Sequence, residues 1–353
     1  MNILFTSLLY DYGIQSRGYS FEFYNFYDSL KRMNNSENNI YHLPIDNVKN
    51  ENEKNILNKK LISICKEKKI DLVFFFLFKD EFYSDVLLDI KKKYSIPTVA
   101  WMADDHWRFD NYSKYISPNF TYVITTDKQS FEKYKKNKIF NVIKSQWGVN
   151  NFLYKRIKDP EIKYDVSFVG QPHGNRRQRI EKVKSIFPNT ICFGSGWDNN
   201  RIEQQNLTSL FNHSAINLNF SESSFTYNFK SMMKIFFSKN SSNKIQFNSI
   251  SKVIKNITNI KNLKRKQIKA RVFEIIGSGG FLLTEYAENL EDYFDLEKEI
   301  CTFQCDQELK DKLKFYKHKS KERNEILEKG YKRAINEHTY EKRFNLIFNK
   351  VFR

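Results

Sequence analysis

The residues most able to do chemistry begin at Lys269. Lys269 and Arg271 supply two cations, and Glu274 supplies a carboxylate three residues later. Gly279, Gly280 and an apolar run follow, an order that predicts a helix, a tight turn and a buried strand. Glycines let the backbone approach a ligand closely, cations bind phosphate, and a carboxylate accepts hydrogen bonds from hydroxyl groups. The stretch therefore predicts a site for a nucleotide diphosphate attached to a sugar.

With its flanking residues, this stretch resembles the C-terminal domain of a bacterial glycosyltransferase family with the GT-B architecture, the group that includes the CgeB-like spore-maturation glycosyltransferases. The similarity continues through Tyr293 and Phe294 and closes on Glu337 to Tyr340 with Arg343. It is close over roughly the last quarter of the chain and looser toward the start. It implies a glycosyltransferase that uses a nucleotide-sugar co-substrate, with no cofactor and no metal.

The resemblance also implies roles for single residues. Glu274 resembles the second glutamate of the Glu-x7-Glu motif of many retaining GT-B enzymes, which holds the donor ribose. The first glutamate would fall on Lys266, so the chain departs from the motif and the stereochemical outcome stays open. Lys269 and Arg271 would neutralise the departing diphosphate. The structural alternative is a solvated helix face on which Glu274 pairs with one of these cations.

Further donor-binding candidates follow predicted strands. Gly170 ends a Phe-Val-Gly turn like the one that opens the donor domain of this family, and Arg176 follows at the start of a helix. An ordinary strand-to-helix turn with exposed arginines is the alternative. Gly196 precedes Trp197, which either borders the base pocket or packs in the core. Two polar residues, Asn219 and Ser221, lie where the family has a strand that runs to the cleft.

The first half of the chain contains a second candidate group. A strand expected over residues 96–103 ends at Asp104, Asp105 and His106, where open α/β sheets bind ligands. A carboxylate or imidazole at this position could accept the acceptor's proton as a general base, with Asp105 as the first choice. Alternatively, Asp104 caps the next helix and His106 packs beside Trp107.

Strands and helices alternate along the chain and predict an α/β protein with two Rossmann-like, doubly wound domains. Residues 70–78 form a near-continuous apolar run, typical of a strand buried on both faces of a parallel sheet. We expect an acceptor domain over 1–150, a linker over 151–163 and a donor domain over 164–338. The resemblance implies a final helix, 339–353, that returns to the first domain, and a cleft between the domains.

Composition narrows the class of protein. The chain has 353 residues, four cysteines without zinc-site spacing, no signal-peptide pattern and no apolar run long enough to span a bilayer, so we expect a cytoplasmic protein. The net charge of +18 favours anionic partners. Two alternatives stay open: a nucleic-acid-binding protein, and a catalytically silent protein that uses the fold as a scaffold.

A basic insertion is expected at about residues 222–262. Glu222 is the only acidic residue between Ser221 and Ala270. Phe229, Met232, Met233, Phe236 and Phe237 could form the apolar face of a helix that lies on an anionic membrane. The alternative is that these side chains fill the second domain's core. Membrane contact would bring the protein to a lipid-linked acceptor, whereas a surface glycan or a protein acceptor remains possible without it.

Overall fold

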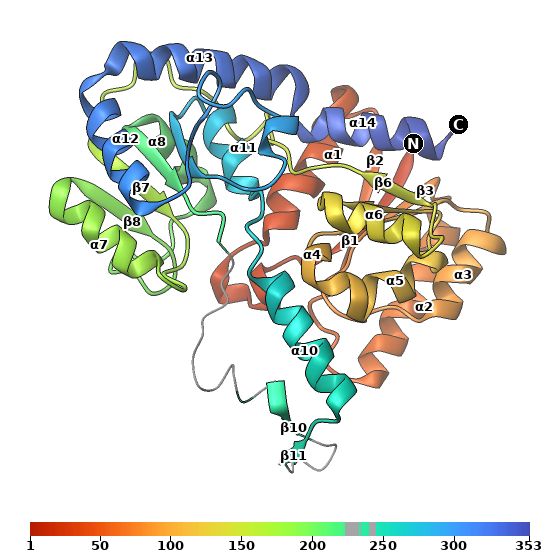
Figure 1. Ribbon diagram of the computed structural model, residues 1–353. Coiled ribbons are helices and arrows are strands. Elements are labelled where there is room, and N and C mark those ends of the chain that lie inside the picture. Colours follow the sequence, from red (N-terminus) through yellow and green to blue (C-terminus); the bar gives the residue numbers. More distant parts are fainter. Residues whose placement is uncertain (223–232, 234, 240–244) are drawn as a thin grey trace. The chain divides into compact units, whose positions relative to one another are not determined.

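The computed structural model describes residues 1–222, 233, 235–239 and 245–353 (Figure 1). The chain forms two compact units. Unit 1 comprises residues 1–154 and 334–353, and unit 2 comprises residues 155–333. The second boundary between them lies within the long helix α13, Ser320–Glu337.

Unit 1 is built on a parallel six-stranded sheet with the order β2-β1-β3-β4-β5-β6. Alternate residues of the same strand enter different hydrophobic clusters: Leu4 packs on one face, and Ile3 and Phe5 pack on the other. This period of two buries both faces of the sheet, which explains the continuous apolar runs in the sequence. The strands are β1 (Asn2–Ser7), β2 (Asn39–Pro44), β3 (Leu72–Phe76), β4 (Thr98–Met102), β5 (Tyr122–Thr125) and β6 (Val142–Lys144).

Helices cover both faces of this sheet. On one face lie α2 (Glu51–Glu67), α3 (Ser84–Lys92) and α6 (Lys128–Lys136). Two short helices, α4 (Asp105–Arg108) and α5 (Lys114–Ile116), precede α6 in the chain. On the other face lie a π-helical segment (Phe23–Tyr27), α1 (Asp28–Arg32) and the C-terminal helix α14 (Tyr340–Val351). Thr339 caps α14, whose Phe344 contacts Phe26 and Phe74. The expected return of the last helix to the first domain is thus confirmed.

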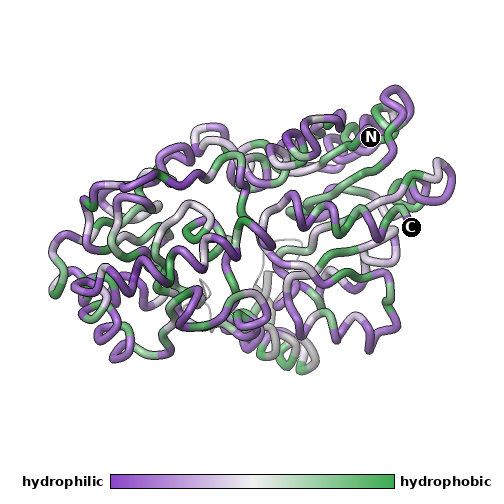
Figure 2. The backbone as a smooth tube through the Cα atoms, turned by 90° about the horizontal axis from the view of Figure 1, so that it is seen from above, coloured by the Kyte–Doolittle hydropathy of each residue, from purple (hydrophilic) through white to green (hydrophobic). Residues whose placement is uncertain are grey.

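Unit 2 has a parallel five-stranded sheet with the order β13-β12-β9-β7-β8. Its strands are β7 (Tyr164–Val169), β8 (Thr190–Phe193), β9 (Ser214–Asn219), β12 (Leu282–Glu285) and β13 (Cys301–Phe303). Two helices, α7 (Arg176–Ile186) and α12 (Asp306–His318), share a buried cluster with these strands. Two others, α8 (Gln204–Asn212) and α11 (Ala270–Gly277), contact β9 outside that cluster. Figure 2 shows the strands as mostly hydrophobic segments among more hydrophilic helices.

A small antiparallel hairpin and one helix separate β9 from α11. The hairpin consists of β10 (Phe237–Lys239) and β11 (Ile245–Phe247), and α10 (Ile250–Leu263) follows it. Among the described residues, no helix is long and apolar enough to cross a membrane.

Each sheet has one point at which the strand order reverses. In unit 1 it lies between β1 and β3, because β2 was added on one side of β1 and β3 on the other. In unit 2 it lies between β7 and β9 for the same reason. Open α/β sheets bind ligands outside the carboxyl ends of the strands at such a point, since neighbouring loops there diverge. The topology therefore gives each unit one candidate site.

Candidate functional site

Arg176 joins the loops that follow β7 and β9 at the switch point of unit 2. Its guanidinium donates hydrogen bonds to the carbonyl oxygens of Gln171 at 3.4 Å, Phe220 at 3.5 Å and Glu222 at 2.5 Å. Burial lowers the pKa of Arg176, while Glu222 and Glu285 act in the opposite direction. The arginine thus provides a half-buried positive charge at the position where a ligand is expected.

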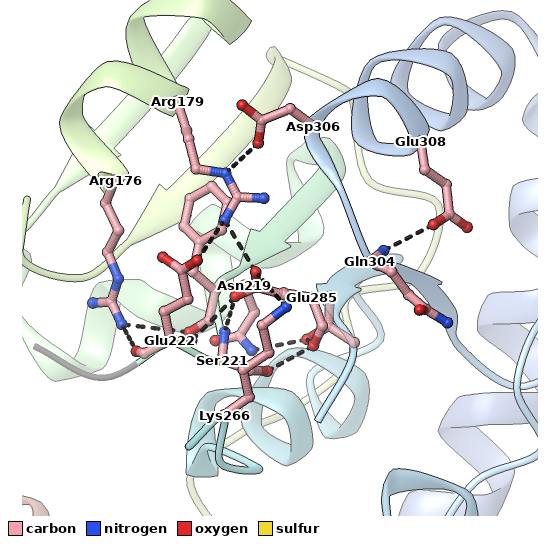
Figure 3. Close-up of polar contacts among 12 residues, drawn as sticks. Arg176, Arg179, Asn219, Ser221, Glu222, Lys266, Glu285, Gln304, Asp306 and Glu308 are labelled. Atoms are coloured by element: carbon pink, nitrogen blue, oxygen red, sulfur yellow. Dashed lines mark hydrogen bonds and ion pairs between the residues drawn. The ribbon is translucent and has the colours of Figure 1, made fainter. Parts of the chain in front are cut away.

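Glu285 is the centre of a buried ionic cluster at the same edge of the sheet (Figure 3). It ends β12, is 1% exposed, and lies 3.2 Å from Arg179 Nη1 and 3.1 Å from Lys266 Nζ. Its Oε2 also accepts hydrogen bonds of 3.1 Å from the backbone amides of Ser221 and Glu222. A buried carboxylate needs such partners because desolvation penalises its charge. The cluster holds β12, α7 and the segment before α11 together.

Two predicted donor residues lie in this cluster. Asn219 Nδ2 donates to Thr284 Oγ1 at 2.9 Å, and Ser221 Oγ donates to the carbonyl of Glu285 at 2.6 Å. Both side chains are at least 95% buried. The structure therefore brings Arg176, Asn219 and Ser221 together, and it makes the last two part of the site's internal hydrogen bonding.

Sequence reasoning missed Arg179, Glu285 and the pairing of Lys266. Glu285 could have been found as the polar last residue of an apolar strand, because the carboxyl ends of parallel strands share one edge. Lys266 was noticed only as a departure from a motif. Its ammonium pairs with Glu285 at 3.1 Å, so this departure places a cation at the carboxyl edge of the sheet.

Lys269, Arg271 and Glu274 lie at or within the first turns of α11. The amide of Gln267 donates to the carbonyl of Ser221 at 3.0 Å, which places the start of this helix beside the Glu285 cluster. Lys269 is the N-cap residue, and Arg271 Nη1 lies 2.6 Å from Glu274 Oε2. Glu274 is 2% exposed. The pairing between cation and carboxylate, considered above as the structural alternative, is therefore present in the structure.

Gly279 and Gly280 lie at the other end of β12, so the structure does not bring them to this edge. The α11 helix runs back from the carboxyl edge, and the four residues of β12 separate these glycines from the edge by about 13 Å. Gly279 has φ +82°, and a Cβ there would approach Arg156 Cγ to 2.5 Å. A Cβ on Gly280 would lie 2.8 Å from Asn217 Nδ2. The two glycines form the tight turn between α11 and β12, and the predicted contact between them and the donor is wrong.

Gly170 directly follows β7, and Gly196 and Trp197 lie in the loop after β8. Trp197 Nε1 donates to the carbonyl of Gly170 at 2.7 Å, and the ring is 5% exposed. Gly196 has φ +100°, and its carbonyl accepts a hydrogen bond from Arg177. Trp197 is thus a core residue that supports the loop after β7, which Gly170 begins, whereas Gly196 belongs to the loop after β8.

Asp104, Asp105 and His106 lie where β4 passes into α4 in unit 1. Asp105 is 1% exposed and accepts a hydrogen bond of 3.0 Å from the Tyr134 hydroxyl. Burial raises the pKa of Asp105 to about 7. His106 is buried as well, whereas Asp104 is exposed. Of the three predicted catalytic residues, Asp104 is therefore the one that solvent reaches in this structure.

Comparison with known proteins adds two findings. Residues 238–349 match the family model described as "Glycosyl transferase-like". Among curated proteins, no sequence matches the chain.

Solved structures resemble the chain over its whole length. Sucrose-phosphate synthase from Thermosynechococcus elongatus is 10% identical, with a TM-score of 0.59 over 100% of this chain and 99% of that one. HepE from Anabaena in complex with UDP-glucose is 10% identical, with a TM-score of 0.57 over 99% of each chain. A glycosyltransferase from Rickettsia africae is 11% identical, with a TM-score of 0.56 over 100% and 98%. The chain therefore has an α/β GT-B fold and carries a glycosyl transferase-like region over residues 238–349.

Proposed function

We propose that the protein transfers a sugar from a nucleotide-sugar donor to a hydroxyl group of a glycan, a lipid-linked or a protein acceptor. The observation that carries this proposal is the cationic edge of unit 2, where Arg176 and Lys266 lie beside the start of α11. The glycosyl transferase-like region includes α11 and β12. A similar structure binds UDP-glucose, which is a donor of this class.

The cations would act on the leaving group. A sugar leaves its nucleotide through an oxocarbenium-like state while negative charge grows on the diphosphate, so fixed positive charges lower the barrier. Lys269, Arg271 and Arg176 are the proposed ligands of the diphosphate, and Glu274 is proposed to accept hydrogen bonds from the ribose hydroxyls.

These cations would stabilise the leaving diphosphate without a metal. Activity that survives excess EDTA is expected, and activity lost to EDTA and restored by Mg²⁺ would contradict metal independence.

Nucleotide affinity tests the donor site directly. We expect UDP or another nucleoside diphosphate to bind, and Arg271→Ala to weaken it tenfold or more, because a lost charged hydrogen bond typically costs about 1.5 to 3 kcal/mol. Isothermal titration calorimetry of the full chain measures the Kd of the nucleoside diphosphate in each variant. Arg32→Ala is a matched control, since Arg32 also forms a helical ion pair, with Asp28 in unit 1. Equal affinity in folded Arg271→Ala would refute the assignment.

We propose that a carboxylate of the Asp104–His106 group accepts the acceptor's proton. Asp104 is exposed, and Asp105, the first choice from sequence, is buried and bonded to Tyr134. Asp104→Asn should lower kcat by about 10² or more while nucleotide affinity is unchanged. Asp110→Asn, which removes a nearby carboxylate paired with Lys133, is the control. Turnover within about threefold of wild type would remove Asp104 from the mechanism.

We also propose contact with an anionic membrane through α10. Ile250, Ile254 and Ile257 are 80%, 60% and 42% exposed and recur at helical spacing, and Phe247 just before them is 66% exposed. Such an apolar stripe with a net charge of +18 suits a membrane interface. Of the side chains expected to form this anchor, Phe229 and Met232 lie outside the described residues.

Liposome co-sedimentation tests the membrane contact. Vesicles that contain phosphatidylserine should bind the protein at low salt, and vesicles of phosphatidylcholine alone should not. Ile254→Glu with Ile257→Glu should abolish binding, while Leu346→Glu, at a 62% exposed position of α14, should leave it intact. No sedimentation with the anionic vesicles would eliminate this part of the proposal.

A further inference from the structure

A cavity of about 350 Å³ lies within unit 2, at the edge of its sheet opposite the carboxyl edge. Ser214, the first residue of β9, and Phe281, just before β12, line this cavity. The proposed donor site lies where the same strands end, at Asn219 and Glu285. From Ser214 to Asn219 the strand rises by about 16 Å. The cavity has the volume of a small-molecule site and is separate from the donor site.

Hydrogen bonds hold one wall of the cavity, residues 156–162, in place. Asn212, the last residue of α8, accepts a hydrogen bond from the amide of Ile157 at 2.9 Å and donates one to the carbonyl of Ser278 at 2.9 Å. The amide of Lys163 donates to the carbonyl of His213 at 2.8 Å. This wall is thus fixed at both ends to the corner between α8 and β9. A preformed wall loses little conformational entropy when a ligand binds.

The more exposed charges that line the cavity leave little net charge. Arg156 Nη1 donates to Glu328 Oε2 at 2.9 Å, and Arg156 Nη2 donates to Glu328 Oε1. The hydrogen bond from Arg156 lowers the pKa of Glu328, so the two groups form a compensated ion pair. Asp159 also lines the cavity, but it is exposed and water screens its charge.

Arg323 is the buried charge of the cavity. It lies in the first turn of α13, lines the cavity and is 9% exposed. Its Nη1 donates to the carbonyls of Tyr316 and Lys317 in the last turn of α12, the latter at 3.0 Å. No carboxylate among the described residues pairs with Arg323, and burial lowers the pKa of its guanidinium. A desolvated cation without a counterion favours an anionic ligand.

The remaining donors of Arg323 fit a carboxylate. Its Nε and Nη2 have no hydrogen-bond acceptor in the part of the chain that the structure describes. Their N–H bonds point the same way along one edge of the planar guanidinium, so they can bind both oxygens of a carboxylate. A phosphate monoester would bring a second negative charge close to Glu328 and Asp159. A single carboxylate neutralises the one uncompensated charge.

Apolar side chains complete the cavity, namely Ile157, Phe211, Phe281 and Leu327. They would cover a hydrocarbon body, because removing apolar surface from water is favourable. We infer that this cavity binds a small monocarboxylate with an apolar body, held by a bidentate pair with Arg323. This second site goes beyond the proposed glycosyl transfer and does not depend on it.

Isothermal titration calorimetry of the full chain tests the inference, with octanoate as the probe. Octanoate should bind at one site, and octanamide, which lacks the charge, should bind about tenfold or more weakly. Arg323→Gln should weaken octanoate binding by about tenfold or more and leave octanamide binding nearly unchanged. Because Arg323 also contacts α12, a structural loss would weaken both ligands alike. That result would overturn the inference.

Asn324 provides variants that leave Arg323 in place. This exposed residue of α13 lines the cavity. Asn324→Glu should weaken octanoate binding by about tenfold or more, because its carboxylate repels the ligand and competes for Arg323. Asn324→Gln, which adds length without charge, should bind octanoate like the wild type. Unchanged octanoate binding in folded Asn324→Glu would also overturn the inference.

UDP and inorganic phosphate separate this site from the donor site. Octanoate should still bind in the presence of saturating UDP, because the cavity lies at the far end of β9. Displacement of octanoate by UDP would place the carboxylate at the donor site and contradict the inference. So would the absence of octanoate binding to the wild type, or phosphate binding to the cavity more tightly than octanoate. If octanoate binds and no nucleotide does, the proposed function fails and this inference stands.

Discussion

The buried carboxyl of Asp105 couples the stability of unit 1 to pH. Its ordinary pKa of 3.8 rises to about 7 in the fold, so the native state holds a proton that the unfolded state releases. Stability from this group is full below pH 3.8 and is lost as pH rises through 7. Asp105→Asn should therefore reduce the fall in Tm between pH 5 and pH 8 in scanning calorimetry. Asp110→Asn should keep the wild-type slope, and an equally steep Asp105→Asn curve would contradict the burial argument.

Glu285 is the residue on which the edge of unit 2 depends. Glu285→Gln leaves Arg179 and Lys266 without this carboxylate, and breaking a buried pair costs about 3 to 5 kcal/mol. We expect the lower end, because Asp306 still pairs with Arg179 at 2.8 Å. Urea unfolding measures the loss. Glu288→Gln removes an exposed partner of Arg265 and should change stability by less than about 0.5 kcal/mol. If the two variants lost the same free energy of unfolding, the Glu285 cluster would not stabilise unit 2 more than an exposed ion pair does.

At the scale of elements, α13 depends on one close contact. A Cβ on Gly330 would lie 2.1 Å from the carbonyl oxygen of Glu299. Alanine normally stabilises a helix interior by about 1 kcal/mol relative to glycine, but overpacking costs about 1 to 3 kcal/mol. Because 2.1 Å requires the backbone to move, Gly330→Ala should be net destabilising in urea unfolding. Lys329→Ala, at the exposed neighbour, should be neutral or stabilising. A more stable Gly330→Ala would show that the contact relaxes freely.

The direction of α11 explains one difference between sequence and structure. The spacing of Lys269, Arg271 and Glu274 correctly indicated one helical segment, because neighbours three apart share a face. The following glycines were assigned to the ligand as well. A helix that starts at the carboxyl edge of a parallel sheet ends at the opposite edge, so Gly279 and Gly280 could have been excluded from topology before the structure was known.

At the scale of the molecule, nucleotide binding should slow amide exchange in unit 2 and leave it unchanged in the sheet of unit 1. We expect UDP to slow amide exchange in the loops after β7, β9 and β12 and in the first turn of α11, because a bound ligand suppresses local opening. Strands β1 to β6 should exchange as in the free protein. Hydrogen-exchange mass spectrometry of the full chain measures both. If UDP slowed amide exchange only in unit 1, the nucleotide would bind unit 1, which would contradict the assignment of the donor site to unit 2.

The sequence by itself determined the elements and the fold class. The apolar run at 70–78 predicted the buried strand β3, observed at Leu72–Phe76, because a strand covered on both faces must be apolar throughout. The alternation of strands and helices predicted parallel sheets, because two parallel strands are joined by a crossover connection that is usually a helix. The GT-B fold expected from the sequence is confirmed. Contacts near in sequence, such as Arg271 with Glu274, were also within reach of helical spacing.

Tertiary structure decided which distant residues meet. Arg179 and Glu285 are 106 positions apart and approach only because β7, β9 and β12 end at one edge of a sheet whose order the sequence does not state. Burial likewise separated Asp104 from Asp105: adjacent residues at the end of a strand face different surroundings, and only packing shows which one solvent reaches. Local patterns fix what a segment becomes, while strand order and packing fix which side chains form a site.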